Sequence, residues 1–155
     1  MTSPHEELSP LDFDRFCRDL VNGAADAVIY ADAAGAIRVW NRGAERIFGY
    51  AAEEALGASL DIIIPERLRA RHWAGYDETL KTGRTRYGAG DLLAVPALRK
   101  DGATISVEFT IVPMVDEATG RLSGIGAILR DVTARFNELK ELRKRAAAKI
   151  DHSDD

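Results

Sequence analysis

The sequence predicts an α+β domain built on one antiparallel sheet. The predicted elements follow in the order helix, two strands, helices, three strands and helix along 155 residues, and strands grouped in this way favour an antiparallel sheet. Apolar and polar residues alternate over residues 104–114, as in a strand with one buried face. Gly-containing turns at residues 32–35 and 99–102 can each join two neighbouring strands.

The composition is that of a globular domain and excludes several classes of function. Hydrophobic residues make up 46% of the chain and charged residues 30%, which separates it from disordered tails. The net charge of −4 argues against nucleic-acid binding. No apolar run reaches the ~20 residues of a membrane span, and the polar N-terminus does not resemble a signal peptide, so we expect a cytoplasmic protein without membrane binding. The single Cys17 excludes an intramolecular disulfide and a Cys-based metal cage.

A leading helix is predicted over residues 9–23, after a polar tail over residues 1–8. Ser9 can cap this helix and Pro10 suits its first turn. Apolar residues at spacings of three and four then form one face of the helix: they are Phe13, Phe16, Cys17, Leu20 and Val21. On this face Cys17 is expected to pack and not to react.

The middle of the chain begins with two short strands, residues 27–31 and 37–40, which form a hairpin. The Ala- and Glu-rich residues 41–56 are predicted to form short helices. Pro65 then opens a longer helix over residues 66–81.

The last third is rich in predicted strands. The strand over residues 104–114 is expected to pair with residues 87–98, in which Pro96 suits an edge or a bulge. A final strand over residues 123–130 is followed by a helix from Val132 onward.

Seven short motifs then occur in a characteristic order. They are Ala27-Val-Ile-Tyr-Ala-Asp32, Trp40-Asn41, Ala44-Glu-Arg-Ile-Phe-Gly-Tyr50, Leu56-Gly57, Ile64-Pro65, Arg99-Lys-Asp-Gly102 and Arg130-Asp-Val-Thr133. In this order and spacing they resemble the PAS sensor family over residues 18–133. The resemblance implies a PAS fold, a five-stranded antiparallel sheet with short helices over one face and flanking N- and C-terminal helices. The sensor domain is then expected over residues 24–133, followed by a basic helix and acidic tail over residues 134–155.

The long helix carries the candidate ligand residue. Leu68, His72, Tyr76 and Leu80 recur every four positions, which places His72 on the inward stripe. A neutral imidazole in an apolar pocket is a good axial ligand for heme iron. The alternative is a histidine at the edge of the core that hydrogen-bonds a backbone carbonyl, and the residues alone leave both open.

The stretch from Ile64 to Tyr76 resembles the heme-binding branch of the PAS family. That branch includes the oxygen-sensing domains of rhizobial histidine kinases and a bacterial heme-regulated phosphodiesterase. The resemblance implies heme b as cofactor and His72 as its metal ligand. The resemblance also makes Tyr76 a cofactor-binding candidate, although Tyr76 falls one residue later than the tyrosine that follows the proximal histidine in the branch.

On the distal side, strand alternation sends Val107, Phe109 and Ile111 into the cavity, and Leu129 joins them from the last strand. In the heme branch these positions hold aliphatic residues that crowd a bound gas. An ordinary core strand would contain the same residue types, so this feature does not discriminate between the two.

Two departures concern charge. The arginine that hydrogen-bonds bound oxygen in the oxygen sensors is missing, and Asp91 stands near its position, while Glu78 replaces a second arginine. Arg84 or Arg86 are the candidates to pair with the heme propionates, and Tyr87 beside them is a further cofactor-binding candidate. Without the first arginine, the branch's stable oxygen binding is in doubt, whereas carbon monoxide and nitric oxide depend less on such a donor.

Other functions are less well supported by the residues. The blue-light branch of the family needs a cysteine in the helix that follows Asn41, and residues 42–47 have none, so covalent flavin photochemistry is excluded. A non-covalent flavin or another small molecule stays open. No phosphate-binding loop or nucleophile elbow occurs, so we expect no enzymatic activity.

The terminal helices are expected to carry the output. Val132, Phe136, Leu139, Ala146 and Ile150 approximate a heptad seam, interrupted by Arg143. A homodimer through the terminal helices is expected, and an output domain or partner is not identified. The sequence thus predicts a sensor of a diatomic gas (CO, NO or O2) or of redox state, with a heme-free PAS module for dimerisation or protein interaction as the alternative.

Overall fold

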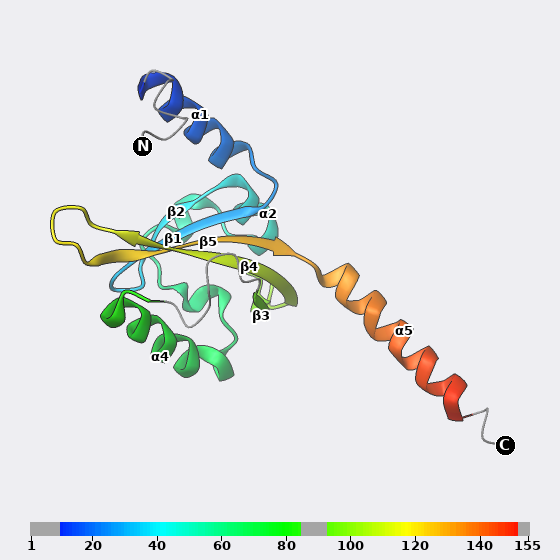
Figure 1. Ribbon diagram of the computed structural model, residues 1–155. Helices are drawn as coiled ribbons and strands as arrows, with labels where there is room; N and C mark the ends of the chain where they lie inside the picture. Colours follow the sequence, from blue (N-terminus) through cyan, green and yellow to red (C-terminus); the bar gives the residue numbers. More distant parts are fainter. Residues whose placement is uncertain (1–9, 85–92, 152–155) are drawn as a thin grey trace, which may run out of the picture.

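One five-stranded antiparallel sheet forms the centre of the molecule (Figure 1). The computed structural model describes residues 10–84 and 93–151. Along the sheet the strands lie in the order β2-β1-β5-β4-β3. Their bounds are β1 Ala27–Asp32, β2 Ile37–Trp40, β3 Leu93–Leu98, β4 Thr104–Val115 and β5 Leu122–Asp131. The predicted antiparallel sheet and its strands are therefore confirmed.

Helices precede, interrupt and follow the strands. They are α1 Pro10–Gly23, α2 Arg42–Phe48, α3 Ala52–Ala55, the 3-10 helix η2 Leu60–Ile63, α4 Glu66–Thr82 and α5 Thr133–Asp151. Figure 1 shows α4 along one face of the sheet, whereas α1 and α5 extend away from the sheet. Within the residues that the structure describes, no helix has the length and apolar character to cross a membrane.

The short η2 helix was not predicted from the sequence. The Ser59 side chain accepts a hydrogen bond from the backbone N–H of Asp61 at 3.1 Å and so caps this turn. Its first and last residues, Leu60 and Ile63, are buried. A single turn is too short to leave a helical period in the sequence, which explains why it escaped prediction.

The core lies between the inner face of the sheet and the helices that cover it. On β1 the buried residues alternate, with Ala27, Ile29 and Ala31 turned inward. Trp40 packs against Phe48 with ring centroids 5.5 Å apart. The inner face of β1 and the aromatic rings of Trp40 and Phe48 therefore belong to one core.

Asn41 joins the end of α1 to the start of β1 and α2. Its side-chain Nδ2 donates to the carbonyls of Val21 at 2.7 Å and Asp26 at 3.0 Å. Its Oδ1 accepts from the backbone N–H groups of Val28 at 2.8 Å and Ala44 at 2.9 Å, the second of which is the N-cap bond of α2. Asn41 is only 3% exposed, and its bond to the Ala44 N–H is buried.

Asn41→Ala is expected to lower the free energy of unfolding by about 3 kcal/mol, because the buried N–H of Ala44 and three partly buried backbone groups lose their partner. A fully buried group left without a partner costs on the order of 1–3 kcal/mol, and a partly buried group costs less. Urea unfolding followed by circular dichroism measures this loss. Asn137→Ala, on an exposed position of α5, is the control and should leave the midpoint nearly unchanged. Equal midpoints for the two variants would contradict this account of Asn41.

Candidate functional site

The site is organised by α4, the longest helix that packs on the sheet. The helix begins after Pro65 and ends at Gly83, whose φ of 68° is left-handed and whose N–H donates to the Thr79 carbonyl at 2.9 Å. Tyr76 and Thr79 are buried on its inner side. His72 is half-buried on the same side one turn earlier, as the fourfold spacing in the sequence predicts.

Tyr76 fastens α4 to β1. Its hydroxyl lies 2.6 Å from the Asp32 carbonyl and 3.0 Å from the Ala31 carbonyl, and donates to this pair of oxygens. Burial, with smaller contributions from the nearby Asp32 and Tyr30, raises the pKa of Tyr76 to about 12. The hydroxyl therefore stays protonated and engaged with the backbone, which makes Tyr76 an anchor of the helix.

Trp73 contacts η2 and the turn between β1 and β2. The sequence analysis did not identify it as a site residue. Its indole Nε1 donates to Asp61 Oδ1 at 2.7 Å, which ties α4 to η2. Its ring lies over Gly35, where an added Cβ would come within 2.2 Å of the ring. Gly35 also has a φ of 80°, so this turn needs glycine for two reasons. Trp73 lies three residues before Tyr76, and this spacing could have indicated that both side chains share one face of α4.

His72 lies among these aromatic side chains. Its ring centroid is 4.7 Å from that of Trp73 and 5.8 Å from that of Tyr76. Its Nδ1 is buried and has no hydrogen-bond partner among the described residues. Burial lowers the pKa of His72, and the negative charge of Asp61 opposes this only in part. The site thus presents a neutral imidazole with one unpartnered nitrogen.

The predicted distal residues share the inner face of the sheet. Val107 and Leu129 are buried, whereas Phe109 and Ile111 are half-buried. Phe109 pairs with Leu129 in the register of β4 and β5, and α4 lies next to β5. These side chains form an apolar surface on the side of the sheet that the helices cover.

Of the residues near the predicted propionate and gas positions, the structure describes only Arg84 and Glu78. Arg86, Tyr87 and Asp91 lie outside the described residues. Arg84 is exposed just beyond α4, where its carbonyl accepts from the Thr82 hydroxyl at 3.1 Å. Glu78 is exposed on the outer side of α4.

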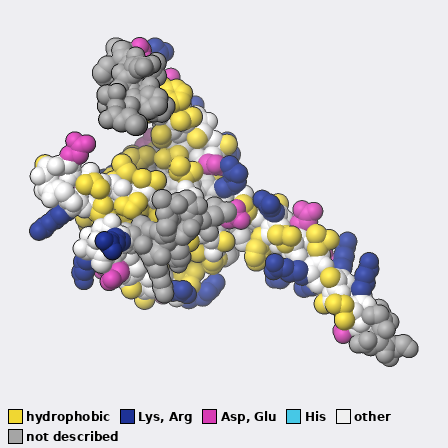
Figure 2. All heavy atoms as spheres, in the orientation of Figure 1, with side chains coloured by type: hydrophobic (Ala, Val, Ile, Leu, Met, Phe, Trp, Pro, Cys, Tyr) yellow, Lys and Arg dark blue, Asp and Glu magenta, His cyan; other side chains and the backbone are white. Residues whose placement is uncertain are grey.

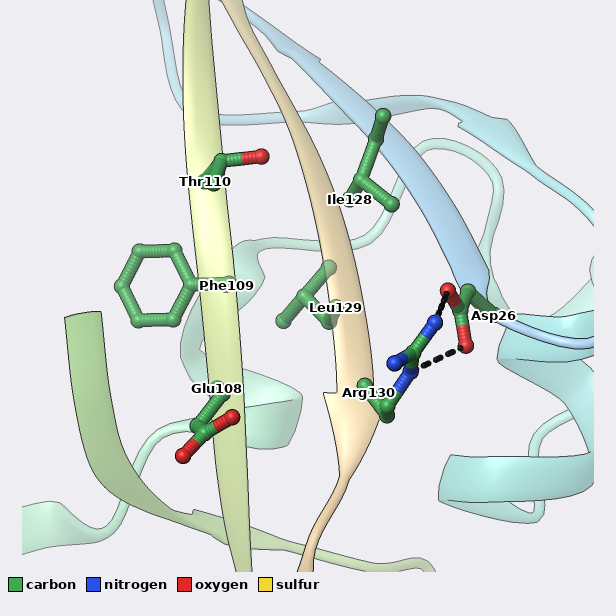
Figure 3. Close-up of a pocket in the computed structure, with 7 residues that line it drawn as sticks. All are labelled: Asp26, Glu108, Phe109, Thr110, Ile128, Leu129 and Arg130. Atoms are coloured by element: carbon green, nitrogen blue, oxygen red, sulfur yellow. Dashed lines mark hydrogen bonds and ion pairs between the residues drawn. The ribbon is translucent and has the colours of Figure 1, made fainter. Parts of the chain in front are cut away.

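A hollow lies over neighbouring residues of β4 and β5 (Figure 3). It is lined by Asp26, Glu108, Phe109, Thr110, Ile128, Leu129 and Arg130. Its volume of about 250 Å³ is below the ~300–1,000 Å³ of ordinary ligand pockets. The Arg130 guanidinium donates to both carboxylate oxygens of Asp26, at 3.1 and 2.9 Å. This hollow therefore contains the ion pair that joins the segment before β1 to the end of β5.

A second hollow lies beside the turn that joins β3 to β4. Its two cations are already engaged, because Arg99 donates to the Ile47 carbonyl at 2.6 Å and Lys100 pairs with Glu54 at 2.8 Å. No group of three His, Cys, Asp or Glu side chains within the described ranges could hold a metal ion.

Comparison with known families and proteins gives consistent matches. The family model of the PAS fold matches residues 15–132. An uncharacterised protein of Azorhizobium caulinodans is 34% identical over 83% of this chain, and the sensor protein FixL of Bradyrhizobium diazoefficiens is 30% identical over 79%. The oxygen sensor protein DosP of Escherichia coli is 27% identical over 76%. The matches cover 17%, 25% and 14% of these three proteins, so the chain spans a quarter or less of each.

Solved structures agree on the fold. A PAS domain of a protein from Colwellia psychrerythraea superposes with a TM-score of 0.69 at 23% identity, over 79% of this chain and 99% of that one. An RNA-binding light-oxygen-voltage receptor also gives 0.69, at 22% identity, over 98% of this chain and 42% of that one. At these identities the likeness shows a shared fold.

The half-buried His72 predicts a pH dependence of stability. The unfolded chain takes up a proton on His72 near the ordinary pKa of 6.5, whereas the folded chain takes it up only at lower pH. The unfolded state therefore binds more protons between the two pKa values, and stability is lost as the pH falls below about 6.5.

Urea unfolding of the wild type and of His72→Gln at pH 7.5 and 5.5 measures this contribution. The loss of stability between the two pH values should be smaller in His72→Gln, while His152→Gln, which removes a different histidine, should behave like the wild type. The same loss in all three proteins would show that His72 takes up its proton equally in both states.

Proposed function

Because this chain belongs to the PAS family of sensor domains, we propose that it is a heme b-binding sensor with His72 as the axial ligand of the iron. The signal is a diatomic gas or a change in redox state. The observation that carries the proposal is the unpartnered buried nitrogen of His72.

The donor chemistry at His72 suits heme. An imidazole binds iron in its neutral form, and burial lowers the pKa of His72 and so favours that form. A buried polar atom without a partner costs on the order of 1–3 kcal/mol, so the folded chain gains when this nitrogen acquires a ligand. The alternative was a core histidine that hydrogen-bonds a backbone carbonyl. The Nδ1 of His72 makes no such bond.

The residue types on β4 and β5 are compatible with the same cofactor. Val107, Phe109 and Leu129 are apolar and are predicted to face the porphyrin, and Arg84 and Arg86 are the cations that would pair with its propionates. When bound through one imidazole, heme iron supplies a position for a gas ligand and a change of oxidation state. Tyr76 is not assigned to the cofactor, because its hydroxyl is held by β1.

The relatives are consistent with a sensor of this kind. FixL is named a sensor protein and DosP an oxygen sensor protein. This chain lacks the arginine that the resemblance leads one to expect next to bound oxygen. We therefore propose carbon monoxide, nitric oxide or redox state as the signal ahead of stable oxygen binding.

Hemin titration of the purified chain, followed by its Soret absorption, tests the proposal. The wild type should saturate at one heme per chain, and the band should shift after reduction and exposure to carbon monoxide. His72→Ala should bind hemin at least about tenfold more weakly, since even the loss of a residue that supports a metal ligand costs about 10–100-fold. Circular dichroism should show that this variant remains folded.

His152→Ala is the matched control, because it removes an imidazole from another part of the chain. Equal hemin binding by His72→Ala and His152→Ala would assign the iron to another residue. A wild type that takes up no hemin would overturn the heme proposal, and a heme-free interaction module would then be favoured. Mass spectrometry of the denatured extract would reveal a flavin or another small molecule in its place.

A further inference from the structure

The inner side chains of α4 are held in place by other parts of the molecule. In α5, by contrast, no residue is buried, and hydrophobic side chains lie along the surface of the helix (Figure 2). α4 buries Tyr76 and Thr79 on its inner side, and the Trp73 ring contacts that of Tyr76. The contacts that hold Trp73 therefore also bear on the neighbouring His72.

The Trp73 indole is held at both of its ends. At one end Nε1 donates to Asp61 Oδ1 at 2.7 Å. At the other end the six-membered ring lies against Gly35, in the turn between β1 and β2. The Leu60 N–H donates to the Gly35 carbonyl at 3.2 Å, so the two supports of the indole are joined to each other. The indole cannot turn without losing one of these contacts.

Asp61 is itself fixed beside α4. Its backbone N–H donates to Ser59 Oγ at 3.1 Å, and its backbone carbonyl accepts from Arg69 Nη2 at 3.3 Å. Arg69 Nε donates in turn to the Ile64 carbonyl at 3.1 Å. Arg69 and Trp73 are four residues apart and so share one face of α4. The Asp61 carboxylate therefore has a defined place from which it holds the indole.

The fixed indole meets the His72 ring edge to face. The two ring centroids lie 4.7 Å apart and the ring planes are inclined by 78°, an arrangement that aromatic rings favour. The Tyr76 ring lies 5.8 Å from that of His72 and 5.3 Å from that of Trp73. Among the described residues His72 Nδ1 has no hydrogen-bond partner, so these ring contacts orient the imidazole in place of a hydrogen bond at this nitrogen.

We propose that Trp73, held by Asp61, is a positioning residue that sets the direction in which the His72 imidazole points. In most metal sites a hydrogen bond to the histidine ring has this task and strengthens metal binding. The consequence for heme binding rests on the proposed function, whereas the orientation of the ring is a property of the heme-free chain.

Four variants of the full-length chain test the proposal. Asp61→Ala removes the acceptor of the indole N–H, whereas Asp61→Asn keeps an acceptor oxygen and removes only the charge. Trp73→Phe keeps an aromatic ring and removes the N–H. Trp40→Phe is its matched control, because the Trp40 indole also donates one hydrogen bond, to the Tyr50 carbonyl at 2.9 Å.

The first readout needs no heme. Carbon–proton NMR of labelled histidine follows the Cε1–Hε1 group of each of the three histidines, and His72→Gln identifies the His72 signal by its loss. The spectra are recorded at pH 7.5, where His72 is neutral because burial lowers its pKa. The His72 signal should move in Asp61→Ala, because the ring current of the released indole changes at His72. It should stay close to the wild-type position in Asp61→Asn and Trp40→Phe.

Hemin titration is the second readout. Asp61→Ala and Trp73→Phe should bind hemin about tenfold more weakly than the wild type, as expected when a residue that supports a metal ligand is lost. Asp61→Asn and Trp40→Phe should bind hemin like the wild type. Circular dichroism should show that all four variants remain folded.

Three results would overturn the proposal. The first is a His72 signal that stays in place in Asp61→Ala. The second is an equal shift in Asp61→Asn and Asp61→Ala, which would assign the effect to the charge of Asp61. The third is equal weakening of hemin binding in Trp73→Phe and Trp40→Phe. A wild type that takes up no hemin would overturn the heme proposal alone, because the NMR comparison is made without heme.

Discussion

The attachment of α4 to β1 through the Tyr76 hydroxyl is the contact on which the site depends. This hydroxyl meets the Ala31 and Asp32 carbonyls at the end of β1 and fixes the rotation of the helix. His72, one turn earlier, is then turned inward, where burial keeps its imidazole neutral. Trp73 closes the adjacent side by packing over Gly35. A helix rotated by a quarter turn would bring His72 into water, and the argument for a bound metal would disappear.

The same strand connects this site to the terminal helices. β1 pairs along its length with β5, from Ala27 opposite Leu129 to Asp32 opposite Gly124. At one end β1 carries the Tyr76 contact, and just before its other end Asp26 pairs with Arg130. A change in the packing of α4 therefore has a continuous path of hydrogen-bonded backbone to the bases of α1 and α5. The proposed sensing would act by shifting the balance between two packings of these elements.

Much of the fold could be predicted because its strands and helices have one buried face. Alternation over residues 104–114 predicted β4, and the fourfold spacing of Leu68, His72 and Tyr76 predicted the inner side of α4. The four bonds of Asn41 and the contact of Trp73 with Gly35 could not be predicted, since both join segments that are distant in the sequence. Periodicity predicted that His72 faces inward. For the same reason it could not show that the Nδ1 of His72 lacks a hydrogen-bond partner. Arg86, Tyr87 and Asp91 stay predictions from the sequence.

The central claim is that the His72 imidazole is the group that holds the iron, and chemical rescue tests it most directly. His72→Gly removes the ring, and free imidazole can then be supplied during a hemin titration. The account predicts weak hemin binding by the variant alone, and recovery of one heme per chain with the wild-type Soret band when imidazole is added. Wild-type binding by His72→Gly without imidazole would contradict the account.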